Sequence, residues 1–235
     1  MLALTNYTFP YEAEESLMRL GHRTLRLPPH PSLLTPVASH PDMLLFFAPD
    51  AFFCTKSYYK IATKELAEIS LIYGAPVCCI EEEYENAYPR DVLLNALPMK
   101  KHLFCNTKTV AKELLTLDLE PCHINQGYSK CSALPLGADA LITSDASITQ
   151  KAKQTGIDVL EIQTGHILLD SYDYGFIGGC ASFAPRGKIN TVYFCGDISK
   201  HPDAKRIEIF CRLHGFELTS LSNSCLCDVG TIFMI

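Results

Sequence analysis

The sequence predicts an α+β fold in which a unit of strand, strand, helix and strand recurs five times around an axis, as a five-bladed αβ-propeller. Four consecutive stretches between residues 35 and 222 show this order. The ends of the chain carry the parts of a fifth unit, because residues 2–28 have the pattern strand, helix, strand and residues 227–235 that of one strand. Repeats of this length are typical of rings and arrays, and a ring leaves no sheet edge exposed. We therefore expect the C-terminal strand to join the N-terminal half-blade and close the ring.

Each unit is recognised by apolar runs that favour strands and by an amphipathic helix before the third strand. In the last unit, Pro202 lies in the first turn of the helix and Gly215 follows its end. The alternative is an ordinary α+β domain in which strands and helices alternate without forming a ring. The N-terminal part consists of LALTNYT, YEAEESLMRLG and HRTLRLP, and the last strand is CDVGTIFMI. The first complete unit consists of TPVASHPD, MLLFFAPD, a helix over 58–73 and APVCCIEE, and the second of YPRDVLLNALP, KHLFCNT, the helix KTVAKELL and EPCHINQ. The third consists of GYSKCSALPL, DALITSD, the helix ASITQKAKQTG and IDVLEIQT, and the fourth of DYGFIGGCASF, NTVYFCGD, the helix SKHPDAKRIEIFCRLHG and FELTSLS.

Composition limits the classes of function. The 235 residues are expected to form one domain, residues 1–235, and the net charge of −6 without a run of Lys or Arg argues against nucleic acid as a partner. No stretch approaches the roughly 20 apolar residues that span a bilayer, and the N-terminus lacks a signal-peptide pattern, so we expect a cytoplasmic protein that does not bind membranes. Its 11 cysteines are then expected to be reduced and mostly buried. Their spacing indicates no zinc site, and no cofactor is expected.

The first strand of each unit lines the axis of such a ring, so the candidate functional groups are the polar residues of those five strands. We expect a small-molecule ligand in the axial channel. The oligomeric state cannot be inferred from the pattern. The candidates are His40 and Asp42, then Arg90, Asp91 and Asn95, then Tyr128, Lys130 and Cys131, then Gly178, Gly179 and Cys180, and finally Asp228.

The tripeptide His40-Pro41-Asp42 predicts a pair of functional side chains. A residue before proline favours extended geometry, which places His40 and Asp42 on the same face. Such a pair serves as a general base or binds a cation. The alternative is a turn at the mouth of the ring with Asp42 as a helix cap. The second copy, His201-Pro202-Asp203, is better explained as a helix start.

Cys131 is the best single candidate for a nucleophile, but packing is its favoured role, because buried cysteines are common and the chain has ten others. In an extended strand its neighbour Lys130 points to the opposite side, so Lys130 need not lower the pKa of the thiol. Asp91 and Asn95 share a face of their predicted strand. They would bind each other, a backbone group or a cationic ligand.

The glycines of the segment YDYGFIGGCASF do not form a phosphate loop, because a dinucleotide fingerprint leads directly into a helix and a strand is expected here. We interpret Gly178 and Gly179 as sites where another backbone or a ligand approaches closely at the axis. Cys180 shares the strand face of Gly178 and is interpreted as a packing residue.

Several motifs resemble an uncharacterised bacterial family with the pentein fold, the fold of the guanidino-group-modifying enzymes. They are SHPDM, YPRDVLLNA, NQGYSKCS, LITSD, GHILLDSYDYGFIGG, GDISKHPD and DVGTI, and the resemblance extends from about Pro28 to Ile235. The superfamily includes arginine and agmatine deiminases, dimethylarginine hydrolases and amidinotransferases. The resemblance implies a Cys nucleophile, a His and acidic groups that hold a guanidinium. The sequence departs from the enzymes' pattern, because CDVGTIFMI has no Cys after its Gly and no Glu-Gly-Gly-Asp stretch occurs. Only Arg90 and Asp91 resemble the enzymes' guanidinium-binding strand.

Two hypotheses of different classes follow. In the first, the protein modifies a guanidino or amidino compound as a hydrolase or transferase with the catalytic residues Cys131, His40 and Asp91. Cys131 would be the nucleophile, His40 would transfer protons, and the carboxylates of Asp42 and Asp91 would anchor the cation. In the second, it is a non-catalytic binding or scaffold protein that keeps the fold and lacks the chemistry. A transition-metal protein is the least favoured, since no ligand spacing is diagnostic. The substrate-binding residues expected for the enzyme are Asp42, Asn95, Tyr128, Lys130, Gly178, Gly179 and Cys180.

Overall fold

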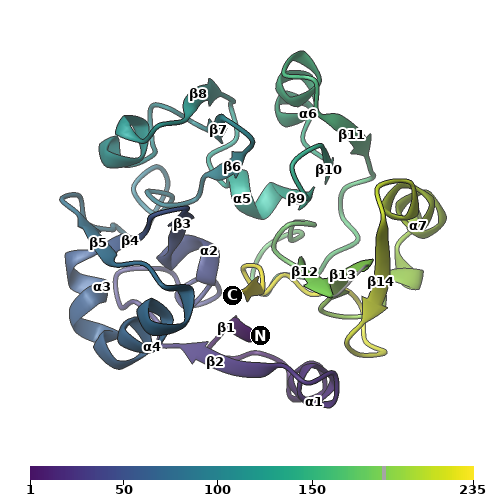
Figure 1. Ribbon diagram of the computed structural model, residues 1–235, viewed down its shortest axis with the longest axis horizontal. Coiled ribbons are helices and arrows are strands. Elements are labelled where there is room, and N and C mark those ends of the chain that lie inside the picture. Colours follow the sequence, from purple (N-terminus) through teal and green to yellow (C-terminus); the bar gives the residue numbers. More distant parts are fainter. Residues whose placement is uncertain (187–188) are drawn as a thin grey trace.

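The computed structural model describes residues 1–186 and 189–235, which form five three-stranded sheets arranged around a common centre (Figure 1). In every sheet the middle strand is antiparallel to the first strand and parallel to the third. The predicted α+β fold of five repeated units is confirmed. Sheet by sheet, the strands are β15 (Phe233–Met234), β1 (Leu2–Asn6) and β2 (Arg23–Leu27); β3 (Phe46–Ala48), β4 (Ala51–Thr55) and β5 (Val77–Ile80); β6 (Leu97–Met99), β7 (His102–Cys105) and β8 (Glu120–His123); β9 (Ala133–Leu136), β10 (Ala140–Thr143) and β11 (Asp158–Glu161); and β12 (Ala181–Arg186), β13 (Ile189–Phe194) and β14 (Phe216–Ser220).

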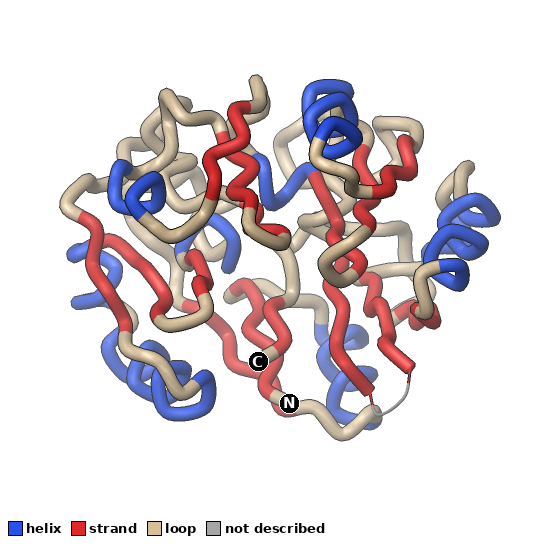
Figure 2. The backbone as a smooth tube through the Cα atoms, turned by 45° about the horizontal axis from the view of Figure 1, so that its top comes forward, coloured by secondary structure: helices blue, strands red, loops and turns tan. Residues whose placement is uncertain are grey.

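The two ends of the chain belong to one sheet, as the half-units of the sequence predict. β15 is antiparallel to β1, with Ala3 opposite Met234, and Leu2 and Ile235 exchange two backbone hydrogen bonds of 2.8 and 2.9 Å. Figure 2 shows the two termini side by side at the ends of these strands. All five residues of β1 are buried, so the apolar LALTN segment packs inside the molecule. None of the helices in the described part of the chain has the length and apolar character needed to cross a bilayer.

The longer helices lie on the outside of the ring, between the second and third strands of their units (Figure 1). Local signals set their ends: the Asp145 carboxylate accepts a hydrogen bond from the Ile148 N–H at the start of α6, and Gly74 ends α4 at a φ of +78°. The third unit has a short 3₁₀ helix, η1, where an α-helix was predicted. The helices are α1 (Tyr11–Arg19), α3 (Lys56–Ile61), α4 (Thr63–Tyr73), η1 (Lys112–Thr116), α6 (Ala146–Gln154), η2 (Ile198–Lys200) and α7 (Ala204–Leu213).

The first strands differ from the prediction, because each begins later than the apolar pattern indicates. In the first complete unit the predicted strand TPVASHPD contains no strand, because α2 (Pro41–Leu44) begins within it and β3 begins only at Phe46. In the other units the predicted segment opens with irregular structure or a short helix, such as α5 (Ser129–Ser132) before β9. In α2, proline at the first helical position lets the His40 carbonyl accept hydrogen bonds from the Met43 and Leu44 N–H groups. An apolar run alone does not distinguish a buried strand from a buried helical turn.

We call these pre-strand stretches the axial segments: residues 40–44, 89–96, 128–132, 175–180 and 227–231. They carry almost all of the polar residues that the sequence places at the axis. The residues for which strand-face arguments were made are therefore not on strands, and those arguments are wrong. They are His40, Asp42, Asp91, Asn95, Lys130, Cys131, Gly178 and Cys180. α2 and α5 lie near the centre of Figure 1, so the residues of these two helices come from the middle of the ring.

Candidate active site

The five axial segments are hydrogen-bonded to one another in a circle. The Asn95 amide nitrogen donates to the Asp42 carbonyl at 3.2 Å, and the Asn95 side-chain oxygen accepts from the Lys130 N–H at 2.8 Å. The circle continues from the Gly179 N–H to the Cys131 carbonyl at 2.9 Å, from the Val229 N–H to the Gly179 carbonyl at 3.0 Å, and from the Asp42 N–H to the Gly230 carbonyl at 3.1 Å. Every blade therefore contributes to one network at the axis.

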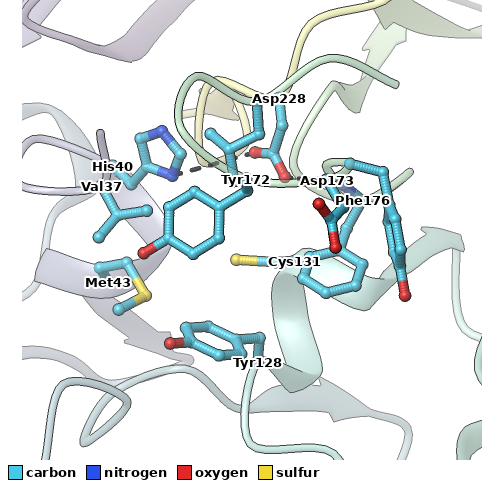
Figure 3. Close-up of a pocket in the computed structure, with 11 residues that line it drawn as sticks. Val37, His40, Met43, Tyr128, Cys131, Tyr172, Asp173, Phe176 and Asp228 are labelled. Carbon is cyan, nitrogen blue, oxygen red and sulfur yellow. Dashed lines mark hydrogen bonds and ion pairs between the residues drawn. The ribbon is translucent and has the colours of Figure 1, made fainter. Parts of the chain in front are cut away.

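A cavity of about 250 Å³ lies against this circle, and Figure 3 shows the side chains that line it. One side is aromatic: the rings of Tyr128 and Phe176 are stacked with their centres 6.3 Å apart, and Tyr174 meets Phe176 edge-on at 6.0 Å. Tyr172 is a fourth aromatic residue of the lining. Aromatic faces of this kind bind organic cations.

Tyr128 is held from behind by a buried carboxylate. Its hydroxyl donates a hydrogen bond of 2.6 Å to Asp91 Oδ2. Burial raises the pKa of Asp91, and the hydrogen bond from Tyr128 opposes that rise. Asp91 does not line the cavity, so it acts on the site through the position of the Tyr128 ring.

The Cys131 thiol faces the cavity and is held by two side chains. It donates a hydrogen bond of 3.0 Å to Asp42 Oδ2, and the Asn95 amide nitrogen lies 3.0 Å from the sulfur as a donor. The Asn95 amide cannot turn over without loss, because its oxygen accepts from the backbone N–H groups of Lys130 and Cys131. Burial and the nearby carboxylates raise the pKa of Cys131 well above its ordinary value, so the group is a neutral thiol.

Two buried carboxylates flank Cys131. Burial raises the pKa of Asp42 to about 6 and that of Asp228 to about 7. Asp228 accepts hydrogen bonds from the Phe176 and Gly230 N–H groups at 2.8 and 2.9 Å. Asp42 Oδ1 is buried and has no hydrogen-bond partner among the described residues. Both groups have pKa values near neutrality, which suits them to proton transfer.

His40 lies beside Asp228, with 3.9 Å between its Nδ1 and Asp228 Oδ1. This distance is longer than a hydrogen bond, and burial lowers the pKa of His40 to about 3. His40 is therefore a neutral imidazole at neutral pH. Gly230 makes this position of His40 possible, because a Cβ on Gly230 would come within 2.1 Å of His40 Cβ. Gly230 also has a φ of +70°, which favours glycine.

Replacing Gly230 by alanine is expected to lower the free energy of unfolding by about 3 kcal/mol or more, because it combines left-handed strain with a clash in the core. Gly74→Ala is the matched control, since Gly74 has a similar φ of +78° and nothing within 4 Å of the added Cβ. The control should lose only about 1 kcal/mol. Urea unfolding of both variants measures the difference, and equal losses would contradict the packing role of Gly230.

The Lys130 side chain points away from the cavity that the Cys131 thiol faces. Its ammonium donates to Thr231 Oγ1 at 2.8 Å, lies 5.7 Å from the centre of the Phe233 ring and lines a second cavity of about 330 Å³. Cys131 and Lys130 therefore face two different cavities, although they are adjacent in α5. Burial lowers the pKa of Lys130, and Asp42 opposes that effect.

The structure brings some of the predicted residues together and separates others. His40, Tyr128, Cys131 and Asp228 line the cavity, whereas Asp42, Asn95 and Asp91 support lining residues from behind.

Gly178 and Gly179 are sites of close approach. A Cβ on Gly178 would meet the Ala133 and Lys130 carbonyl oxygens at 2.3 Å, and a Cβ on Gly179 would meet the Asp228 carboxylate at 2.0 Å. Cys180 is buried in an apolar cluster away from the lining. Arg90 pairs with Glu82 and Glu85 outside the cavity. All eleven cysteines are free, and most are buried.

The sequence interpretation missed the residues that cover the cavity. Tyr172, Asp173, Tyr174 and Phe176 line it from the connection between β11 and β12, which was interpreted as the beginning of a strand. The signal was the alternation of aromatic and acidic residues in YDYGF, which is unusual for a strand that packs against an axis.

Five ββαβ units around a polar centre define the class: the chain has the pentein fold. It is similar to a mutant of DDAH from Pseudomonas aeruginosa in complex with citrulline, with 10% identity over 93% of this chain and 90% of that chain and a TM-score of 0.54. It is also similar to an amidinotransferase of the saxitoxin biosynthetic pathway from Microseira wollei, with 11% identity over 97% and 93% of the two chains and a TM-score of 0.55.

Within that class, residues 4–233 match the family of unknown function DUF6873, and the chain belongs to this family. No curated protein sequence matches it. At 10–11% identity the solved structures establish the shared fold alone.

Proposed function

We propose that the cavity binds a small guanidinium or amidinium compound and that Cys131 attacks its central carbon, as a hydrolase or an amidinotransferase. The observation that carries the proposal is the position of the Cys131 thiol, in an aromatic cavity and hydrogen-bonded to a buried carboxylate. The two solved structures of the same fold, a citrulline complex and an amidinotransferase, support the substrate class by analogy.

The charges of the site favour a cation. Asp42 and Asp228 are two buried carboxylates. Among the described groups that change the pKa of both, Lys130 is the one buried ammonium. Their raised pKa values mean that two negative charges at this place are unfavourable without a further cation. A planar cation between the Tyr128 and Phe176 side and Asp228 would offset that charge and contact the aromatic faces.

The same cation would activate the thiol. A positive charge next to Cys131 lowers the pKa of the thiol, and its proton passes to Asp42 Oδ2 along the existing hydrogen bond. The thiolate then forms a bond to the central carbon, and that carbon becomes tetrahedral. The departing nitrogen takes the proton from Asp42 as its bond to the carbon breaks, and it leaves as ammonia or an amine. The amidino group remains on the Cys131 sulfur.

Release of the product completes the cycle. A water molecule, or an acceptor amine in a transferase, attacks the same carbon, and the bond between the carbon and sulfur breaks. Asp228, with a pKa of about 7, takes the proton of the attacking group with His40 beside it. As the bond between carbon and sulfur breaks, the sulfur takes the proton that Asp228 accepted, and Cys131 becomes a thiol again. The positive charge of the amidino group leaves as a proton to the solvent in hydrolysis and stays on the new guanidinium in transfer.

Binding of a cation is tested by calorimetry with 1-butylguanidine and the neutral 1-butylurea, which have similar shapes. The guanidine is expected to bind at least about tenfold more tightly, because one desolvated contact of a cation with an aromatic ring contributes about 2 kcal/mol. Its affinity should rise from pH 5 to pH 8, since Asp42 and Asp228 lose their protons in this interval while the guanidinium stays charged. Equal affinities, or an affinity that falls with pH, would contradict the proposal.

A non-catalytic protein that binds the same cations is the second candidate. It is favoured by the raised pKa of Cys131, because a neutral thiol is a weak nucleophile. Release of ammonia or amine from the bound guanidine distinguishes the two candidates, since the second requires binding without any product.

A further inference from the structure

We propose that the second cavity, the one that Lys130 lines, is a separate binding site for a small carboxylic acid with an apolar body, and that the Lys130 ammonium binds its carboxylate. The proposed function uses the first cavity, which the Cys131 thiol faces, so this inference holds or fails independently of that function. The expected ligands of the second cavity are anions, whereas those of the first are cations.

The second cavity is formed by the first strands of all five blades, β3, β6, β9, β12 and β15. Its volume of about 330 Å³ lies within the range of roughly 300–1,000 Å³ that is usual for small-molecule sites. Phe47, Pro98 and Pro135 have the same place in three of these strands, because each is half-buried next to buried neighbours on both sides. The ring of strands therefore offers apolar side chains that solvent still reaches.

The lining of this cavity is apolar with one positive charge. Among the described residues that line it, Lys130 and Ser182 have polar side chains, and none is an aspartate or a glutamate. The first cavity has the opposite character, since Asp173 and Asp228 line it. An apolar wall with a single ammonium is complementary to an apolar molecule with a single negative charge.

The Lys130 ammonium has hydrogen-bond donors to spare. It carries three N–H donors, and one of them is used by Thr231 Oγ1 at 2.8 Å. The Phe233 ring, with its centre 5.7 Å away, is the other contact of the charge. No carboxylate of the described chain forms an ion pair with Lys130. The remaining donors are therefore available to the two oxygens of a ligand carboxylate.

Burial makes this ammonium a favourable partner for an anion. Removal from water lowers the pKa of Lys130, and the charge of Asp42 opposes that effect. A carboxylate in the second cavity would stabilise the ammonium in the same sense and by direct contact. Hydrogen bonds between two charged groups are among the strongest in proteins, and an apolar surrounding strengthens them further.

The first test compares 4-phenylbutyrate with 4-phenyl-1-butanol, which have similar shapes and differ in the charge of the polar end. Calorimetry at pH 7 is expected to show at least about tenfold tighter binding of the acid, the size of effect that a hydrogen bond to a charged group produces. Equal affinities would overturn the proposal. Absence of binding would overturn it as well, and a dimer in sedimentation velocity would then assign the cavity to a second copy of the chain.

The second test locates the bound acid by NMR of the methionine methyl groups in the wild-type protein. Met234 lines the second cavity and Met43 lines the first. The phenyl ring of 4-phenylbutyrate is expected to shift the methyl signal of Met234 and to leave that of Met43 in place. A shift of Met43 without one of Met234 would place the acid in the first cavity and overturn the proposal.

The third test removes the charge. Lys130→Met keeps the length and apolar stem of the side chain, and it should bring the acid and the alcohol within about twofold of each other. Lys153→Met is the matched control, because Lys153 is an exposed lysine of α6 that lines neither cavity. The control should keep the tenfold preference. Retention of the preference in a folded Lys130→Met protein would show that another group binds the carboxylate.

Discussion

Replacing Cys131 by alanine is expected to abolish turnover and to preserve the binding of guanidinium ligands. The expected loss is at least ~10³-fold, because Cys131 is the only thiol among the described residues that line the cavity. Binding should persist, since the contacts proposed for the cation come from Tyr128, Phe176 and Asp228. The measurements are release of ammonia or amine and calorimetry on the same protein preparation.

Cys180→Ala is the matched control for this experiment. Cys180 is also a buried thiol of an axial segment, and its sulfur donates to the Ile177 carbonyl at 3.4 Å without lining the cavity. This variant should keep its turnover and lose only a modest amount of stability. Full turnover in Cys131→Ala would show that Cys131 is not the nucleophile. Binding without turnover in the wild type, for every guanidinium ligand that binds, would favour the non-catalytic function.

Asp42→Asn is expected to gain stability relative to the wild type as the pH rises. The pKa of Asp42 is about 6 in the folded protein and near 3.8 in the unfolded chain, so the folded state binds the proton more tightly. Wild-type stability from this group is therefore greatest below about pH 4 and is lost as the pH rises through 6. The asparagine has no such dependence. The difference between variant and wild type should grow by on the order of 3 kcal/mol between pH 4 and pH 8.

Urea unfolding at several pH values measures this difference. Taking the difference between the two proteins matters because His40 has the opposite dependence: its lowered pKa stabilises the fold as the pH rises from about 3 to 6.5. Asn replaces Asp42 with nearly the same shape and still accepts the hydrogen bond from Cys131. A difference that does not change with pH would mean that Asp42 titrates like an exposed aspartate.

The repeat pattern was sufficient to predict the fold, and the positions of the first strands were not predictable from it. The pairing of LALTN with the C-terminal strand followed from two half-units that completed each other. In contrast, MLLFFAPD was interpreted as one strand, although α2 ends within it at Leu44, β3 begins at Phe46 and the second strand is β4. The helical turn after His40 depends on hydrogen bonds and tertiary packing, which an apolar pattern does not encode.

The part of the candidate site that depends on the order of the units around the ring could be predicted from the sequence. His40, Cys131 and Asp228 line one cavity because each precedes the first strand of its blade. Cys131 and Lys130 point in opposite directions as expected, although they lie on the helical turn α5 and not on a strand. The position of Asp91 behind Tyr128 depends on how short turns pack, so it could not be derived from spacing. Tyr172 and Asp173 belong to a connection whose path is fixed by backbone bonds from Leu168 to Leu226 and Asp228, far later in the chain.

The circle of hydrogen bonds among the axial segments has a consequence for folding. Its links join Asp42 to Asn95, Asn95 to Lys130 and Gly179 to Val229, so the site does not exist until the first and last blades have met. A partly folded chain therefore has no binding cavity, and a ligand that binds there recognises only the finished molecule. Such a ligand stabilises the native state as a whole rather than one blade, and its binding reports that assembly of the chain is complete.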